Sequence, residues 1–223
     1  MISDKRIVIF DLCGTLYDSN TTMDFIREKV FSEKRQYRLF NKVSHFIGWK
    51  VFNKVLYKLL GLDLTRVIFV RSLKGYARTE LNLLAEEFIK TTLSNKEITI
   101  AQEMLRNEMA QEKRVAIVSA SMDFLVQAIA KELGVKEYYA TTLDFASETG
   151  ICNGRILHDL LGNKLETCRL HNLDVSKAFV ITDNLSDAEL VSKSSEAFIV
   201  AKKKNELFWT KFPTVKEIYV FDR

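Results

Sequence analysis

Residues 6–16 read RIVIFDLCGTL, and this stretch decides the fold that we expect. Residues 6–10 are mostly β-branched or aromatic and form a run that is too short for a helix. Such a run is typical of a buried strand in a parallel sheet. The run ends abruptly at Asp11, so the sequence predicts that this carboxylate lies where the first strand leaves the sheet.

The rest of the chain alternates between strand and helix patterns, apart from one long helical stretch. Residues 20–106 show helical periodicity, with one ambiguous apolar run at 67–70. Alternation of strands with helices predicts a doubly wound parallel sheet. We therefore expect an α/β core domain, residues 1–18 and 104–223, and an inserted helical domain, residues 19–103. The later strands are expected at 114–118, 138–143, 178–182 and 197–201, the helices at 122–133, 165–173 and 187–192, and a short hairpin at 151–157.

Composition excludes several classes of protein. The 223 residues are 47% hydrophobic and 28% charged, which is ordinary for a globular protein. The three cysteines, Cys13, Cys152 and Cys168, have no CxxC spacing, which favours a reduced cytoplasmic protein without a zinc ribbon. No stretch approaches the roughly 18 apolar residues of a transmembrane segment. The net charge of +4 is too small to indicate nucleic acid by itself, and no nucleic-acid partner is expected.

Polar residues follow the predicted strands at several places. Asp11, Ser119 and Asp183 come directly after strands, Asp187 lies one turn later, and Lys164 precedes a helix. In open α/β sheets, ligands bind beyond the carboxyl ends of the strands. Two carboxylates that converge there repel each other unless a cation lies between them, and oxygen ligands suit Mg²⁺. Mg²⁺ with a lysine and a hydroxyl is a receptor for a phosphoryl group.

Four pieces of the sequence, in this order, resemble the haloacid dehalogenase (HAD) superfamily in its phosphoserine-phosphatase-like branch. They are FDLCGTL at 10–16, VSAS at 118–121, Lys164 and TDNLSDAEL at 182–190. The resemblance implies a HAD-type Rossmannoid core, and the inserted helical domain stands where that family has a helical cap. It also implies an Mg²⁺-dependent phosphatase that acts on a phosphorylated small molecule.

The resemblance implies a role for each matching residue. Asp11 would be the nucleophile that forms an aspartyl-phosphate, and Mg²⁺ would be held by Asp11, Asp183 and the backbone carbonyl of Cys13. Ser119 and Lys164 would bind phosphoryl oxygens, and Lys164 would also offset the charge of Asp11. The two remaining roles are that Thr15 would tie down the loop or the phosphate, and that Asp187 would orient Lys164 or a metal-bound water.

Cys13 departs from the family pattern. Phosphatases of the family usually have an aspartate there, which protonates the leaving group and then activates water. A thiol with an ordinary pKa of about 8.5 is a poor substitute. Three functions stay open: a slow or specialised phosphatase, a phosphotransferase with a long-lived intermediate, and a phospho-ligand or partner-binding protein without turnover. Asp11 and Asp183 could also simply cap the helices that follow them.

Basic and aromatic residues are concentrated in residues 31–60. This segment holds seven Lys and Arg against one acid, Glu33. One interpretation is that the aromatic side chains pack within the helical domain while the lysines lie in water. The alternative is a surface for an anionic substrate or for a lipid-linked phosphate in a membrane.

Overall fold

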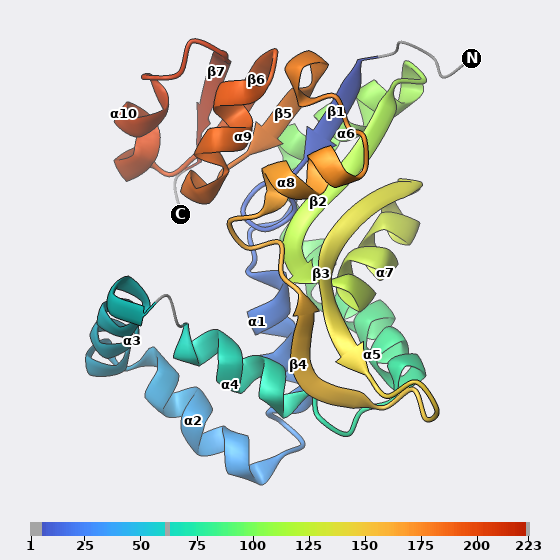
Figure 1. Cartoon of the computed structure of the whole chain (residues 1–223), viewed down its shortest axis with the longest axis vertical. Coiled ribbons are helices and arrows are strands. Elements are labelled where there is room, and N and C mark those ends of the chain that lie inside the picture. Colours follow the sequence, from blue (N-terminus) through green and yellow to red (C-terminus); the bar gives the residue numbers. More distant parts are fainter. Residues whose placement is uncertain (1–5, 61–62, 222–223) are drawn as a thin grey trace.

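The computed structural model describes residues 6–60 and 63–221, and one seven-stranded sheet forms its centre (Figure 1). Residues 1–5, 61–62 and 222–223 of the two predicted domains lie outside the described residues. The strand order is β4-β3-β2-β1-β5-β6-β7, and only β3 and β4 pair antiparallel. The strands are β1 Ile7–Phe10, β2 Arg114–Met122, β3 Glu137–Phe145, β4 Cys152–His158, β5 Phe179–Thr182, β6 Glu196–Ala201 and β7 Val215–Val220.

The helices fall into two groups. Between β1 and β2 lie α1 Thr21–Phe25, α2 Arg35–His45, α3 Ile47–Leu60, α4 Leu64–Ser72, α5 Arg78–Thr91 and α6 Thr99–Ala110. After β2 come α7 Asp123–Leu133, α8 Lys164–Leu170, α9 Ala188–Lys193 and α10 Glu206–Trp209. Short helical turns are η1 Ile26–Val30, η2 Leu93–Asn95, η3 Val175–Lys177, η4 Leu185–Asp187 and η5 Lys203–Asn205.

β1 is the central strand of the sheet, and its four residues are buried. Val8 and Phe10 pack into one hydrophobic cluster with α1, α5 and α7, whereas Ile7 and Ile9 pack into another with α8, α9 and α10. This two-residue alternation puts apolar side chains on both faces of the strand. Helices therefore cover both faces of the sheet, which confirms the predicted doubly wound α/β fold.

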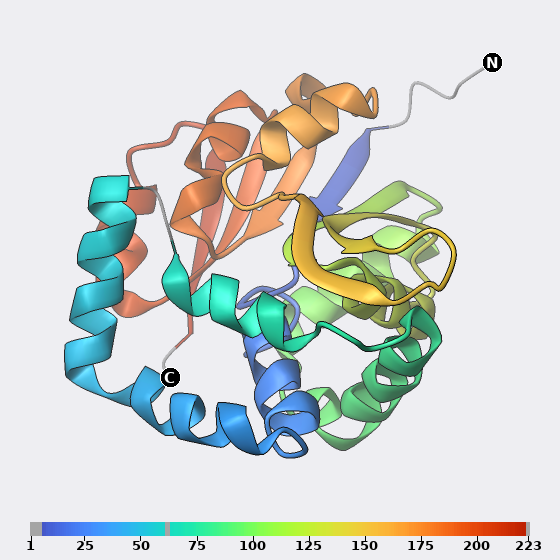
Figure 2. The ribbon, with the colours of Figure 1, turned by 60° about the horizontal axis from the view of Figure 1, so that its bottom comes forward.

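The helices between β1 and β2 divide into an inner and an outer set. The Phe25 ring of α1 lies 5.7 Å from that of Phe88 in α5 and 5.2 Å from that of Phe124 in α7, so these helices share one core with the sheet. By contrast, α2, α3 and α4 form an outer arm that curves below the carboxyl ends of the strands (Figure 2). The ambiguous run at 67–70 lies inside α4.

The predicted hairpin at 151–157 is wrong. β4 is one strand that pairs antiparallel with β3, and the turn lies before it, where the Gly150 amide donates to the Ala146 carbonyl. Gly154 has a φ of +69°, and a Cβ there would lie 2.9 Å from the Cβ of Lys74 and 3.1 Å from the carbonyl oxygen of Arg71. The glycine therefore marks the close approach of α4 rather than a turn.

Other expected elements are present with shifted ends. The strand expected at 114–118 continues to Met122, and the helix expected at 165–173 ends at Leu170. The edge strand β7 was not predicted. Among the described residues, no helix is both long enough and apolar enough to cross a bilayer.

Candidate active site

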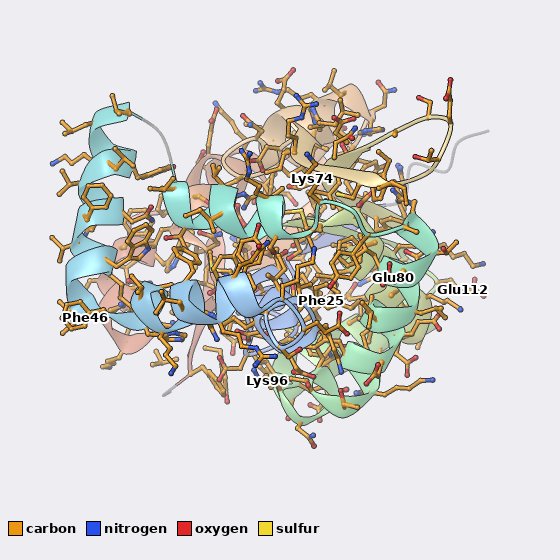
Figure 3. All side chains as sticks on the ribbon, turned by 90° about the horizontal axis from the view of Figure 1, so that it is seen from below. Phe25, Phe46, Lys74, Glu80, Lys96 and Glu112 are labelled. Carbon is orange, nitrogen blue, oxygen red and sulfur yellow. The ribbon has the colours of Figure 1, made fainter. Side chains whose placement is uncertain are left out.

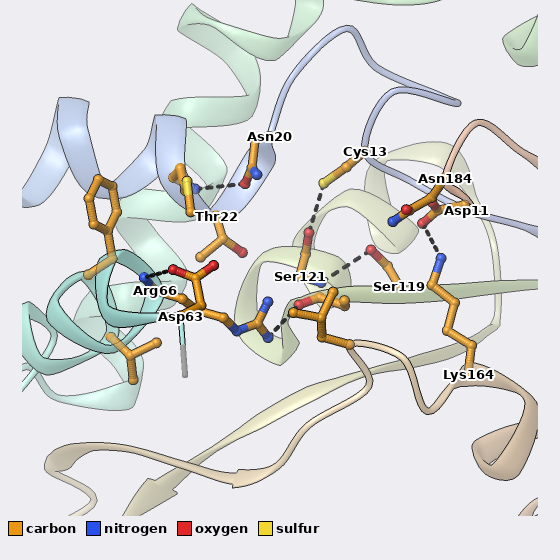
Figure 4. A pocket seen from close by; sticks show the side chains of 15 residues that line it. Asp11, Cys13, Asn20, Thr22, Asp63, Arg66, Ser119, Ser121, Lys164 and Asn184 are labelled. Carbon is orange, nitrogen blue, oxygen red and sulfur yellow. Dashed lines mark hydrogen bonds and ion pairs between the residues drawn. The ribbon is translucent and has the colours of Figure 1, made fainter. Parts of the chain in front are cut away.

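A cavity of about 180 Å³ lies at the carboxyl ends of β1 and β2 (Figure 4). The sheet side of its lining contains Asp11, Ser119 and Lys164, and the opposite side contains Arg66 of α4. Figure 4 shows these polar side chains converging from the Asp11 loop, β2, α4 and α8. Other lining residues include Cys13, Asn20, Thr22, Asp63, Ser121 and Asn184.

An ion network forms the floor of this cavity. The Lys164 Nζ atom lies 2.8 Å from Asp11 Oδ1 and 2.7 Å from Asp187 Oδ2, and all three side chains are almost completely buried. Asp187 Oδ2 also accepts a hydrogen bond of 2.7 Å from the Thr182 hydroxyl. The network fixes the ammonium group directly beside the predicted nucleophile.

Burial and the neighbouring charges shift the pKa values of this network in opposite directions. Burial raises the pKa of Asp11 to about 6, even though Lys164 opposes the rise. Burial alone would lower the pKa of Lys164, but Asp11 and Asp187 outweigh that effect and raise it. Lys164 therefore stays an ammonium ion at neutral pH and can face a phosphoryl group as a fixed positive charge.

The Asp11 carboxylate has one oxygen in use and one without a partner. Oδ1 faces Lys164 and accepts a hydrogen bond of 2.7 Å from the Leu12 amide. Oδ2 is buried, and no hydrogen-bond partner for it exists among the described residues. A buried carboxylate oxygen without a partner is costly, so this atom indicates a place for a cation or an incoming ligand.

Asp183 follows β5, the strand that pairs parallel with β1. Asp183 Oδ1 accepts a hydrogen bond of 3.3 Å from Thr15, and a Cβ on Gly14 would come within 2.2 Å of Asp183 Oδ2. Gly14, with a φ of +77°, thus lets the loop after β1 approach this carboxylate. The adjacent ends of β1 and β5 bring the two predicted metal-ligating carboxylates to one edge of the sheet.

This donor set fits Mg²⁺ rather than a metal that requires many protein ligands. The described residues contain no group of three or more His, Cys, Asp and Glu side chains that could hold a metal ion. Mg²⁺ commonly keeps several waters and uses only one or two carboxylates together with substrate phosphates. The unpaired Oδ2 of Asp11 could supply one such ligand, whereas Asp183, which follows the adjacent strand, does not belong to the cavity lining.

Neither carboxylate caps a helix. Asp11 accepts from the amide of its neighbour Leu12, and the turn after β5 is capped by Asn184, whose side chain accepts from the Ser186 amide. This turn, η4, carries Asp187. The simple capping interpretation of Asp11 and Asp183 is therefore wrong.

Cys13 belongs to a neutral hydrogen-bond network. Its Sγ atom lies 3.1 Å from the Ser121 hydroxyl and 3.2 Å from the Thr21 hydroxyl, and these two hydroxyls are 2.6 Å apart. Burial, together with the charge of Asp11, raises the pKa of the Cys13 thiol. The group is therefore a protonated thiol at neutral pH.

Two of the predicted substrate-binding residues have different surroundings. Ser119 lines the cavity, and its hydroxyl accepts a hydrogen bond of 3.2 Å from the Ser121 amide. Thr15 is fully buried against Asp183 and does not belong to the cavity lining. The structure thus brings Asp11, Ser119 and Lys164 together around the cavity and leaves Thr15 behind it.

Sequence reasoning missed Arg66. Its guanidinium reaches from α4 to the core, where it contacts Asp159 Oδ1 at 2.7 Å and donates to the Ala120 carbonyl at 3.2 Å. Its Nε atom is buried without a partner among the described residues. The only sequence signal was indirect: Asp63 caps α4 by accepting from the Arg66 amide, which marks where that helix begins.

Solved structures share this fold over nearly the whole chain. A protein of unknown function from Bordetella pertussis Tohama I matches with a TM-score of 0.73 at 19% identity, covering 95% of this chain and 98% of that one. A probable phosphoserine phosphatase from Vibrio cholerae matches with a TM-score of 0.62 at 16% identity, covering 95% and 60% respectively. A phosphoserine phosphohydrolase-like protein from Francisella tularensis matches with a TM-score of 0.61 at 15% identity, covering 95% and 94%. At these identities, the likeness shows the fold alone.

A search of curated proteins gives no match to this chain. The family model described as haloacid dehalogenase-like hydrolase matches residues 8–192. That range contains the Asp11 loop, Ser119, Lys164 and Asp183. The chain belongs to the haloacid dehalogenase-like hydrolase family.

Proposed function

We propose that this chain is a phosphatase that acts on a phosphate monoester, with Asp11 as the nucleophile. The observation that carries the proposal is the ammonium group of Lys164, held 2.8 Å from Asp11 at the floor of the cavity. Lys164 and the Ser119 hydroxyl would bind the phosphoryl oxygens. Asp187 would position Lys164, to which it is bonded at 2.7 Å.

The same proposal includes Mg²⁺ held by Asp11, Asp183 and the backbone carbonyl of Cys13. The metal would neutralise charge on the phosphoryl oxygens and on the two carboxylates. The unpaired Oδ2 of Asp11 supports this assignment, because a cation would satisfy it. Thr15 would hold Asp183 in place through its 3.3 Å hydrogen bond rather than touch the phosphate.

The reaction would proceed in two steps. In the first, an Asp11 oxygen bonds to phosphorus, the ester P–O bond breaks, and the departing oxygen takes a proton from water. In the second, water attacks the phosphorus of the aspartyl-phosphate, which releases inorganic phosphate and the Asp11 carboxylate, while one proton of the attacking water passes to bulk water.

Cys13 makes the second step the slow one. A thiol of raised pKa keeps its proton at neutral pH, and as a neutral group it cannot take a proton from water. The intermediate would accumulate, and an acceptor alcohol could compete with water for the phosphoryl group. The same observation therefore also favours the phosphotransferase alternative.

Arg66 and the arrangement of the chain complete the proposal. Arg66 lies opposite Lys164 across the cavity and would contact the part of the substrate that does not react. We retain the core domain at residues 1–18 and 104–223 and the cap domain at 19–103, with α1 and α5 as the part of the cap that packs on the core and α2, α3 and α4 as its outer arm. We also retain a cytoplasmic location, since all three cysteines are free thiols.

Rapid-mixing kinetics with an aryl phosphate and Mg²⁺ test this function. We expect a burst of phenol close to one equivalent of enzyme, followed by slower steady turnover, and acid quenching should trap phosphate on Asp11. Asp11→Asn should abolish both the burst and the steady rate. A folded protein that binds Mg²⁺ and phosphate but shows neither phase would instead be a phospho-ligand-binding protein.

A further inference from the structure

The outer arm carries exposed apolar side chains on α2 and α3. None of the residues in Ile47–Leu60, all of which the structure describes, is buried. Ile47 is 76% exposed and Leu59 74%, and Phe46 lies at the outer corner where the two helices meet (Figure 3). We call this set the α2–α3 face: Leu39, Val43, Phe46, Ile47, Val51, Val55 and Leu59.

The α2–α3 face points away from the rest of the molecule. The opposite side of α3 is attached to α4, because Trp49 donates a hydrogen bond of 2.9 Å to the Thr65 hydroxyl and Asn53 donates one of 3.0 Å to Asp63. Ile47 begins a series of apolar residues with four-residue spacing, which makes a stripe on one side of a helix. The stripe is therefore an outer surface that the described part of the chain leaves uncovered.

Basic residues border that stripe. Lys50, Lys54 and Lys58 repeat with the same four-residue spacing, so they form a row beside the apolar stripe, and all three are exposed. Residues 31–60 contain seven basic residues and a single acid, Glu33. An apolar face flanked by lysines is the pattern of helices that lie in the interface of anionic membranes.

Charge favours a membrane over a second copy of this chain. In a symmetric dimer, this face would meet itself, and the lysines of one copy would approach those of the other with almost no acidic partners. Anionic lipid headgroups supply the missing negative charge. α3 has 14 residues and is about 21 Å long, which suits a helix that lies along the surface rather than across the bilayer.

A second cavity lies between α3 and the candidate active site and shares lining residues with the first cavity. It has a volume of about 460 Å³, is lined on the α3 side by Trp49, Lys50 and Tyr57, and shares Met23 and Asp63 with the first cavity. The first cavity, at about 180 Å³, is smaller than the roughly 300–1,000 Å³ of sites that enclose a whole drug-sized ligand. A phosphoryl group in the first cavity would therefore leave the rest of its molecule in the second, beside α3.

We propose that the α2–α3 face docks on an anionic membrane and presents the active site to a phosphomonoester lipid of that membrane. The apolar stripe inserts among the acyl chains near the headgroups, and the lysine row faces the lipid phosphates. The assignment of the substrate class rests on the proposed phosphatase function. The docking on a membrane does not depend on that function.

Vesicle flotation of the full chain tests the docking. We expect the protein to float with vesicles of phosphatidylglycerol and phosphatidylcholine and to stay unbound with phosphatidylcholine alone. The double variant Ile47→Glu/Leu59→Glu should bind at least tenfold more weakly, while Leu207→Glu, which changes a 79% exposed leucine of α10, should bind like the wild type. Equal binding of the two variants, or no flotation of the wild type, would overturn the proposal.

A charge exchange tests the exposed basic residues of α2 and α3 in the same assay. Lys42→Glu/Lys58→Glu should weaken flotation, whereas the matched pair Lys204→Glu/Lys211→Glu, exposed on the core, should not. Sedimentation equilibrium without lipid tests the alternative that a second copy of the chain binds to the α2–α3 face. A dimer that Ile47→Glu/Leu59→Glu converts to monomers would assign this face to self-association and would refute membrane docking.

Turnover measurements separate this inference from the proposed function. All four variants should hydrolyse a soluble aryl phosphate at the wild-type rate, since none of the substituted residues lines either cavity. Ile47→Glu/Leu59→Glu should lose at least tenfold in hydrolysis of phosphatidic acid within anionic vesicles, Lys42→Glu/Lys58→Glu should also lose part of it, and the two control variants should keep the wild-type rate. Wild-type flotation without turnover of either substrate would keep the docking and refute the phosphatase function. Turnover of the soluble ester with no flotation would keep the phosphatase function and refute the docking.

Discussion

Two networks that meet in the loop after β1 differ in their charge. Asp11 faces Lys164, which also faces Asp187, and the three ions are buried within hydrogen-bond distance. Two residues later, Cys13 joins two hydroxyl groups in a network without any charge. Under the proposed function, this loop would keep the residues for phosphoryl binding and attack, while the residue at the position for proton transfer would be neutral. Substitutions in the charged network and substitutions at Cys13 should therefore have separate effects.

The largest effect should come from breaking the charged network. Lys164→Met leaves Asp11 and Asp187 buried without their counter-ion, so we expect a loss of about 3–5 kcal/mol in the free energy of unfolding, together with all turnover. Urea denaturation at neutral pH measures the loss. Lys131→Met, which breaks an ion pair with Glu86 at a 77% exposed lysine, should cost less than about 1 kcal/mol. Equal costs would show that the buried network adds no special stability.

The second effect should come from restoring a charge to the neutral network. Cys13→Asp supplies a carboxylate that can both donate and accept the proton, a function that contributes about 10²–10⁴ in rate. We expect steady turnover of an aryl phosphate to rise at least about tenfold and the burst to disappear. Cys13→Asn has a similar shape but no titrating group, so it should give no gain. A folded Cys13→Asp variant that binds Mg²⁺ without faster turnover would count against the two-step reaction.

A third effect concerns the pH dependence of stability without metal. The pKa of Asp11 is about 6 in the fold against an ordinary 3.8, so protonation favours the folded state. That stability is complete below about 3.8 and is lost as the pH rises through about 6. Asp11→Asn should therefore be more stable than the wild type at pH 7, by on the order of 1–3 kcal/mol, and similar to it near pH 4.

Urea denaturation across this pH range, with a chelator present, checks the sign. Adding Mg²⁺ should stabilise the wild type more than Asp11→Asn, because a ligand stabilises only the state that binds it. A stability difference that does not change with pH would mean that Asp11 does not titrate in this way.

The smallest expected effect concerns the reactivity of the Cys13 thiol. Because the pKa of its thiol is raised, alkylation by iodoacetamide should be slow at pH 7 and several-fold faster above about pH 9. Cys152 and Cys168 are buried, so Cys13→Ser should remove the labelling of the folded protein. Mass spectrometry after limited alkylation measures the site. Rapid labelling of Cys13 at pH 7 would instead show a reactive thiolate.

The sequence predicted the charged network better than the neutral one. Asp11 and Asp183 each end a short buried strand, and parallel strands bring such ends to one edge of a sheet. Lys164 and Asp187 were recognised with them through the resemblance to a family. The contacts of Cys13 with Thr21 and Ser121 were not foreseen, because hydroxyl groups 8 and 108 residues away carry no spacing signal.

Contacts between distant segments limited the other predictions. The ion pair of Arg66 with Asp159 depends on how α4 lies over the loop after β4, which no local pattern records. β7 was not predicted because it is a half-exposed edge strand with charged residues among its apolar ones. Gly154 suggested a turn because Asn-Gly pairs favour hairpins, but here the packing of α4 overrides that local preference.

The close approach of Gly154 to α4 should make the residues of β4 and of the end of α4 change together in evolution. Main-chain hydrogen bonds from Gly75 to Cys152 and from Cys152 to Tyr76 fasten the end of α4 to β4 beside this glycine. A side chain at position 154 would push the helix outward and shift Arg66, which lies on the same helix. We therefore expect substitutions at 154 to co-vary with those at 71–75 in related chains, and lineages that change both to diverge in the substrates they accept.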